Sequence, residues 1–107
     1  MDQTAAIESL GALAHSIRLE AFRALIAAGP QGLTPSALIE MLEVPSAKLS
    51  FHLKELAISG LVTQEHAGRN IIYRAAYDRM DALLAYLTEN CCQGAGCATS
   101  AAAACSC

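Results

Sequence analysis

The five cysteines of this 107-residue chain all lie within its last nineteen residues, ENCCQGAGCATSAAAACSC. Thiolates are soft ligands that favour thiophilic ions over calcium or magnesium. Three of them, Cys91, Cys92 and Cys97, form a C-C-x4-C group, and three sulfurs complete the pyramidal shell of trivalent arsenic or antimony. Tetrahedral zinc or cadmium favours a fourth ligand, which Cys105 or Cys107 could supply. The tail therefore predicts a soft-ion site and leaves the choice of ion open.

The spacing of these cysteines constrains the backbone that carries them. Neighbouring side chains on a helix diverge by about 100°, because a turn takes ~3.6 residues. Cys91 and Cys92 can converge on one ion only if the preceding helix ends near Asn90. Gly94 and Gly96 would then let the chain double back to present Cys97. We predict two parts, a folded domain over residues 1–90 and a sensor tail over residues 91–107.

The cellular setting and the charge of the tail argue against other uses of these thiols. The opening residues, MDQTAAIESLGALA, lack the features of a signal peptide, and no stretch reaches the ~18 apolar residues of a membrane span. We therefore expect a cytoplasmic protein with no membrane partner, whose odd number of thiols stays reduced. An oxidoreductase would need a low-pKa cysteine near a cation or a helix N-terminus. No Arg or Lys follows Arg79, so we expect no enzyme and no organic cofactor.

Composition and charge describe the body that precedes the tail. Apolar residues make up 54% of the chain and aromatic residues 5%, a balance that favours helices. The formal net charge is −3, yet residues 46–74 carry four basic and two acidic residues and are net positive. Any phosphate-facing surface is therefore expected in this middle segment.

Periodicity predicts four helices, a hairpin and a last helix. The helices cover residues 4–13, 16–28, 35–42 and 47–59, and the last one follows Asp78. Thr34, Ser46 and Asp78 are expected to cap helices, and Gly60 to end one. In the second helix we expect Leu19, Phe22 and Ile26 to face inward. Strands starting at Leu61 and at Ile71 flank the turn HAGRN.

Two short helices followed by a hairpin predict a mainly α fold with a β-hairpin wing, a winged helix-turn-helix of order ααααββα. The second helix of such a motif enters the major groove of double-stranded DNA. The cations of this helix would contact phosphates, its polar side chains would contact base edges, and an arginine would lie at the wing tip. An ordinary surface helix would have a similar sequence, and His52 could simply pack against its neighbours. The expected DNA-binding residues are Ser46, Lys48, Ser50, His52, Lys54 and Arg69.

The segments ALAHSIRLEAFRAL, SAKLSFHLKELAISGLV and GRNIIYRA resemble the ArsR–SmtB family of metal-sensing winged-helix repressors. The similarity covers residues 7–88 and is strongest in S-x-x-x-S-x-H-L-x-x-L-x-x-x-G-L-V, from Ser46 to Val62. A departure is Ser16, where many members have proline. The resemblance implies a homodimer joined by the first and last helices, and a repressor that leaves operator DNA when an inducer binds. The expected dimerisation residues are Ile7, Leu10, Met80, Leu83, Leu84 and Leu87.

The resemblance also limits where an inducer can bind. A Cys-x-Cys pair before the recognition helix is absent from PSALIEML, and the last helix has carboxylates but no histidine for a zinc-type site. The cysteines after that helix resemble a C-terminal arsenic site, which implies As(III) or Sb(III) as inducer at Cys91, Cys92 and Cys97, and less so at Cys105 or Cys107. The alternatives are a repressor responsive to cadmium, lead, zinc or methylarsenite, and a thiol-rich metal buffer.

Overall fold

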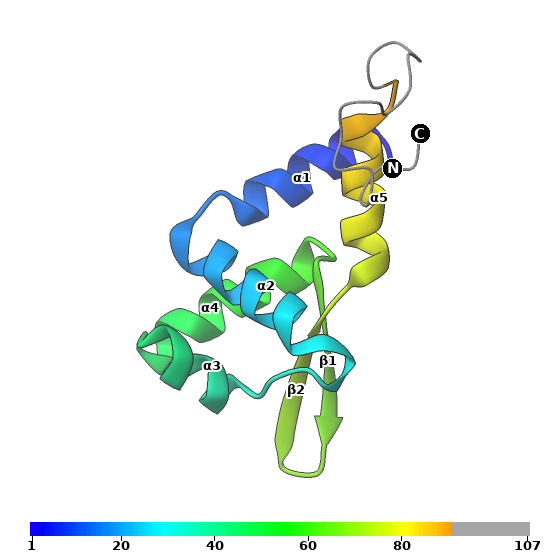
Figure 1. The fold of residues 1–107 in the computed structure, drawn as a ribbon. Helices are drawn as coiled ribbons and strands as arrows, with labels where there is room; N and C mark the ends of the chain where they lie inside the picture. The colour runs from blue at the N-terminus through cyan, green and yellow to red at the C-terminus, as the bar shows by residue number, and fades with distance from the viewer. Residues whose placement is uncertain (91–107) are drawn as a thin grey trace.

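The computed structural model describes residues 1–90, which form five α-helices, a short 3-10 helix and a two-stranded antiparallel hairpin (Figure 1). The helix order and the hairpin agree with the predicted winged helix-turn-helix. The elements are α1 (Gln3–Leu13), α2 (Ser16–Ala28), η1 (Gly29–Gln31), α3 (Pro35–Leu42), α4 (Ser46–Ile58), β1 (Val62–Ala67), β2 (Asn70–Ala75) and α5 (Tyr77–Thr88).

The helix starts show which predicted caps form. Thr34 caps α3, because its Oγ1 accepts a hydrogen bond from the Ala37 N–H at 3.2 Å and Pro35 occupies the first turn. The predicted caps Ser46 and Asp78 are wrong. Pro45 holds the extended cap position of α4, so Ser46 is already helical. Asp78 lies inside the first turn of α5, where its charge still complements the helix dipole.

The core lies where α2, α3 and α4 meet the base of the hairpin. Leu25, Leu38 and Leu56 are fully buried there, and Leu61 and Val62 continue the core into the first strand. The predicted inward face of α2 is only partly correct. Phe22 is buried, but Ala21 and Leu25 accompany it, while Leu19 is exposed. Small alanines on several faces of α2 let more than one neighbouring element approach it, so a single stripe does not define its buried face.

Glycine shapes the end of α4 and the turn of the hairpin. Gly60 has a φ of 84°, and the Leu61 N–H returns to the Leu56 carbonyl, which confirms the predicted stop. The strands pair from Val62↔Ala75 to Ala67↔Asn70, so they extend further into HAGRN than predicted and leave Gly68 and Arg69 as the turn. Gly68 has a φ of 65°, which a two-residue hairpin turn requires at its first position.

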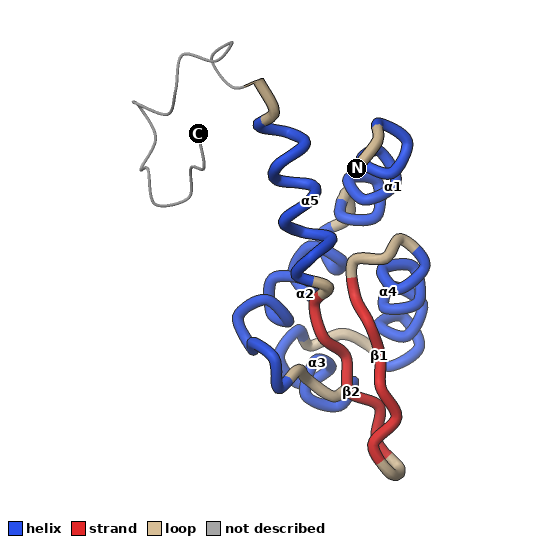
Figure 2. The backbone as a smooth tube through the Cα atoms, turned by 90° about the vertical axis from the view of Figure 1, so that its right-hand side faces the viewer, coloured by secondary structure: helices blue, strands red, loops and turns tan. Residues whose placement is uncertain are grey.

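The hairpin base is also paired to the loop before α3. Leu33 and Tyr73 exchange two backbone hydrogen bonds, with N···O distances of 2.9 and 2.8 Å. The turn end of the hairpin extends away from the helices, at the opposite end of the fold from α1 and α5 (Figure 2). The wing is therefore fixed at its base and open at its turn.

The two terminal helices are joined directly. The Arg79 Nε of α5 donates a hydrogen bond to the Oγ of Ser9 in α1 at 3.2 Å, and Ser9 is fully buried. Within residues 1–90, no helix is long and apolar enough to cross a membrane.

Candidate nucleic-acid interface

Helix α4 buries one face and exposes another that carries positive charge. Leu49, Leu53 and Leu56 point into the core, whereas the opposite face is open to solvent. Both lysines of the chain lie on that open face. The exposed residues in its first nine positions are Ser46, Ala47, Lys48, Ser50, Phe51 and Lys54. Five of the six predicted DNA-binding residues are thereby exposed, four of them on this helix and Arg69 in the hairpin turn.

His52 is the exception, and the expectation that it reads base edges is corrected by its burial. Its side chain is only 5% exposed, and its Nδ1 accepts a hydrogen bond from the Arg18 Nε at 3.0 Å. Its ring also lies against that of His15, with centroids 4.3 Å apart. His52 therefore packs α4 against the start of α2, as the simpler interpretation of this residue expected.

The pKa of His52 follows from these surroundings. Burial lowers the pKa below its usual value of 6.5, and the nearby charges of His15, Arg18 and Lys48 lower it further, while Glu55 acts in the opposite direction. The bond from Arg18 requires an unprotonated Nδ1, so geometry and electrostatics both favour the neutral ring.

Arg18 and Phe51 are two residues of this site that sequence reasoning did not assign. The guanidinium carbon of Arg18 lies 5.7 Å from the centroid of the Phe51 ring. Phe51 also meets the His52 ring edge-on, at 5.4 Å and 65°. Arg18 and His52 are 34 positions apart, so no local pattern reveals their contact. The signal for Phe51 was present, because its helical position places it on the open face.

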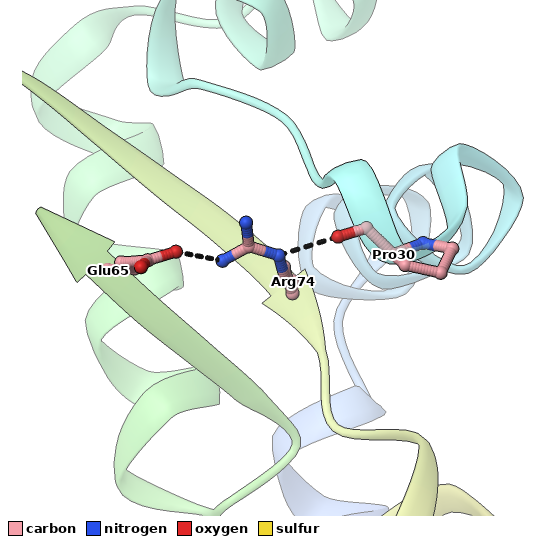
Figure 3. Close-up of polar contacts among 3 residues, drawn as sticks. All are labelled: Pro30, Glu65 and Arg74. Atoms are coloured by element: carbon pink, nitrogen blue, oxygen red, sulfur yellow. Dashed lines mark hydrogen bonds and ion pairs between the residues drawn. The ribbon is translucent and has the colours of Figure 1, made fainter. Parts of the chain in front are cut away.

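The wing offers one cation at its turn and uses another for structure. Arg69 is exposed between the strands, as predicted. Arg74 instead donates from Nε to the Pro30 carbonyl at 2.6 Å and pairs with the Glu65 carboxylate at 2.7 Å (Figure 3). This is the ion pair found within residues 1–90, which leaves Lys48, Lys54 and Arg69 available for phosphates.

The residues expected to form a dimer fall into two groups. Exposed apolar side chains occur on α1 at Ile7 and Leu10 and on α5 at Leu84 and Leu87. Leu83 is buried within the chain at 5% exposure, so the expectation that it meets a second subunit is corrected. It and the half-buried Met80 line an apolar groove of about 470 Å³ between α2 and α5.

The predicted ion ligands Cys91, Cys92 and Cys97, with Cys105 and Cys107, lie outside the described residues. In the part of the chain that is described, no three His, Cys, Asp or Glu side chains gather closely enough to hold a metal ion.

Comparison with known proteins identifies the kind of protein that carries this surface. Residues 13–65 match the family described as "Helix-turn-helix domain", from the end of α1 into β1. The fold is similar to an ArsR-like transcriptional regulator from Rhodococcus sp. RHA1, with a TM-score of 0.70 and 27% identity, over 78% of this chain and 76% of that chain. It is also similar to HlyU from Vibrio cholerae N16961, with a TM-score of 0.68 and 26% identity, over 87% and 100% of the two chains. No curated protein matches the sequence.

The chain is a winged-helix transcriptional regulator of the ArsR-like type. A helix-turn-helix regulator acts by binding DNA and not by catalysis, which agrees with the expectation that the chain is no enzyme. In this ArsR-like regulator the open face of α4 takes the place of the recognition helix, and the hairpin takes the place of the wing.

Proposed function

We propose that this ArsR-like regulator is a repressor that binds operator DNA as a homodimer and is released by arsenite or antimonite. The observation that carries the proposal is the concentration of all five cysteines immediately after α5. Cys91, Cys92 and Cys97 are the proposed ligands of one trivalent ion. A body without thiols gives a soft ion no competing site of the same chemistry.

The end of α5 supports this ligand set. The helix stops at Thr88, Glu89 leaves the helical conformation, and Asn90 has a left-handed φ of 61°. The chain has therefore departed from the helix before the first cysteine. The proposed convergence of Cys91 and Cys92 on one ion requires such an end, since neighbouring side chains of a continuing helix would diverge by about 100°.

The contacts of α5 supply a physical connection between the proposed sensor and the DNA-binding surface. Arg79 ties α5 to α1, and Leu83 packs on the groove that α5 shares with α2. Helix α2 in turn holds α4 through the bond from Arg18 to His52. A ligand releases DNA only through a difference in its affinity for the bound and free states. Operator DNA should therefore weaken arsenite binding by the same factor by which arsenite weakens DNA binding.

The DNA contacts are assigned to the same surface. Lys48, Lys54 and Arg69 are proposed to contact phosphates, while Ser46 and Ser50 face the base edges. Exposed Ile7, Leu10, Leu84 and Leu87 are proposed to form the dimer interface, with Met80 at its border.

Single replacements of the cysteines test the sensor. Cys91→Ser, Cys92→Ser and Cys97→Ser should each bind operator DNA like the parent but resist release by arsenite, measured by fluorescence anisotropy during titration of the reduced protein. The double variant Cys105→Ser, Cys107→Ser is the matched control and should respond like the parent. Loss of response in the control with a normal response in the Cys97 variant would place the site in the last residues instead.

The same titration separates the alternatives. Release by cadmium, lead or zinc but not arsenite would indicate a four-ligand site. Release by methylarsenite with one cysteine dispensable would indicate a two-thiolate site. A metal buffer would bind DNA only weakly and without sequence preference, at an affinity that falls steeply with salt.

A further inference from the structure

The open face of α4 carries an aromatic ring between its two cations. Phe51 is 54% exposed, and Lys48 and Lys54 lie three residues before and after it. On a helix this spacing places the three side chains on neighbouring positions of one face. Phe51 is also the sixth residue of α4, in the N-terminal half that approaches base edges in a helix-turn-helix.

The ring of Phe51 is held in place before any partner arrives. Arg18 lies near it at 5.7 Å, within the range of a cation–π contact, and the edge of the His52 ring supports it at 5.4 Å. Arg18 is itself fixed by donating to the His52 Nδ1, and His52 is buried against His15. A side chain already restrained in this way loses less conformational freedom when it docks.

The chemistry of this face selects nucleic acid as the partner of Phe51. Single exposed apolar residues are common on protein surfaces and need no function. This one is flanked by lysines, which are depleted in protein–protein interfaces and suited to phosphates. In the major groove, thymine alone among the four DNA bases presents a methyl group, and phenylalanine is one of the side chains that contact it.

We propose that Phe51 determines part of the sequence preference of this regulator by contacting the 5-methyl group of a thymine in the operator, and that Arg18 positions the ring for this contact. The proposal rests on the proposed operator binding and adds a base contact to it. Lys48 and Lys54 then contact the DNA phosphates on either side of this base, while the Phe51 ring distinguishes thymine from cytosine and from the purines.

Replacing thymine by deoxyuridine removes the methyl group and keeps the base pair, so it isolates this contact. An operator would first be selected from random double-stranded DNA with the reduced full-length protein. Each thymine would then be replaced in turn and affinity measured at fixed salt. We expect one position in each half-site to lose about fourfold, which is the ~0.8 kcal/mol of a buried methyl group converted at about 1.4 kcal/mol per tenfold.

The variant Phe51→Ala should bind the thymine and deoxyuridine operators equally, while Phe51→Leu retains part of the difference. Ile58→Ala is the matched control, because it removes another exposed apolar side chain from the far end of α4 and should keep the parent ratio. Arg18→Gln should reduce the ratio with Phe51 still present. If Arg18 only contacted phosphate, both operators would weaken by the same factor and the positioning role would be wrong.

The outcomes separate this inference from the proposed function. Failure to select any sequence would overturn operator binding and the inference with it. A selected operator with no fixed thymine, or a methyl effect that persists in Phe51→Ala, would overturn the inference alone.

Discussion

His52 lies at a buried position of α4 and accepts a hydrogen bond from Arg18. Burial, then the charges of His15, Arg18 and Lys48, lower its pKa in the folded chain, against a smaller opposite effect of Glu55. The unfolded chain therefore takes up a proton at a higher pH than the folded chain. Stability from the neutral ring is fully present above the ordinary pKa of 6.5 and is lost as the pH falls below it.

Replacement by a neutral acceptor should remove this pH dependence. His52→Gln keeps an oxygen for Arg18 and carries no charge, so its unfolding free energy should fall less than that of the parent between about pH 7.5 and about pH 5.5, around the ordinary histidine pKa. Urea unfolding at both pH values measures the difference. His66→Gln, at an exposed position of β1, is the control and should behave like the parent. Equal slopes for the parent and His52→Gln would contradict the assignment.

Lys48 and Ser50 should differ in the kind of binding they lose. Lys48→Ala removes one proposed phosphate contact, so affinity should fall on all sequences and the salt slope should decrease by about one. Ser50→Ala should instead change base preference, by about 1–3 kcal/mol if the contact is a good one. Arg23→Gln removes an exposed charge from α2 beside the groove and should leave the slope unchanged. A reduced salt slope in Arg23→Gln would show that the slope reports the net charge of the protein and not a contact of Lys48.

For single residues, the sequence predicts which side chains are exposed better than it predicts which side chains contact each other. The helical period correctly places Lys48 and Ser50 on the open side of α4, because their neighbours Leu49 and Leu53 are buried. The same period puts His52 near the edge of the open face of α4. Its contact with Arg18 is made by another helix, so the period of α4 does not reveal it.

The loop before α3 is the element on which the position of the wing depends. Gly32 has a φ of 71°, and a Cβ added there would lie 2.5 Å from the Tyr73 carbonyl oxygen and 2.7 Å from a methyl carbon of Ile72. Gly29 has a similar backbone, with a φ of 79°, but no atom lies within 4 Å of its added Cβ. The two glycines therefore differ mainly in the space around them.

Substitution by alanine should separate strain from collision. Gly29→Ala should cost about 1–3 kcal/mol, because alanine rarely adopts this backbone conformation. Gly32→Ala should cost a further ~1–3 kcal/mol, because the new methyl group displaces the second strand. Denaturant unfolding of both variants measures the difference. If both variants lose the same unfolding free energy, the pairing of Leu33 with Tyr73 adjusts to the new methyl group at no energetic cost.

Elements were predictable where a local signal is unambiguous. Thr34 followed by Pro35 defines a helix start by its own chemistry, and Gly60 defines an end. Ser46 and Asp78 have suitable side chains, but the N-cap position lies one residue earlier at Pro45 and two residues earlier at Ala76. The pairing of the hairpin base with Leu33 is a tertiary contact that no local sequence pattern predicts.

The whole molecule exposes apolar side chains on both terminal helices. Leu87→Glu should convert the proposed dimer into a monomer, because it places a charge among Ile7, Leu10 and Leu84 if these meet a second subunit. Its far-UV circular dichroism should stay like that of the parent, since Leu87 is 53% exposed and supports no core. Sedimentation velocity at micromolar concentration measures the change. Met41→Glu, at a 57% exposed position of α3, is the control. A parent that is already monomeric on DNA would contradict the proposed interface.

The fold class followed from element order alone, since two short helices and a hairpin leave few other arrangements. The interface of the terminal helices did not follow as cleanly. The stripe of α5 is split, because Leu83 is buried whereas Leu84 and Leu87 remain exposed. One apolar stripe thus contains both buried and exposed side chains, and hydrophobic spacing alone does not distinguish them.

The bond from Arg79 to Ser9 also bears on how the chain acquires its shape during synthesis. Its donor and acceptor are 70 residues apart, so at about 5–20 residues per second Ser9 is added to the chain roughly 3.5–14 s before Arg79. An isolated helix as short as α1 is marginal in water, and hydrogen exchange on stalled chains should find its amides unprotected. Helices α2 to α4 and the wing precede α5 in the chain and therefore emerge before it. The bond that joins the first and last helices can form only after α5 has been made, and until then Ile7 and Leu10 belong to a nascent chain that lacks this contact.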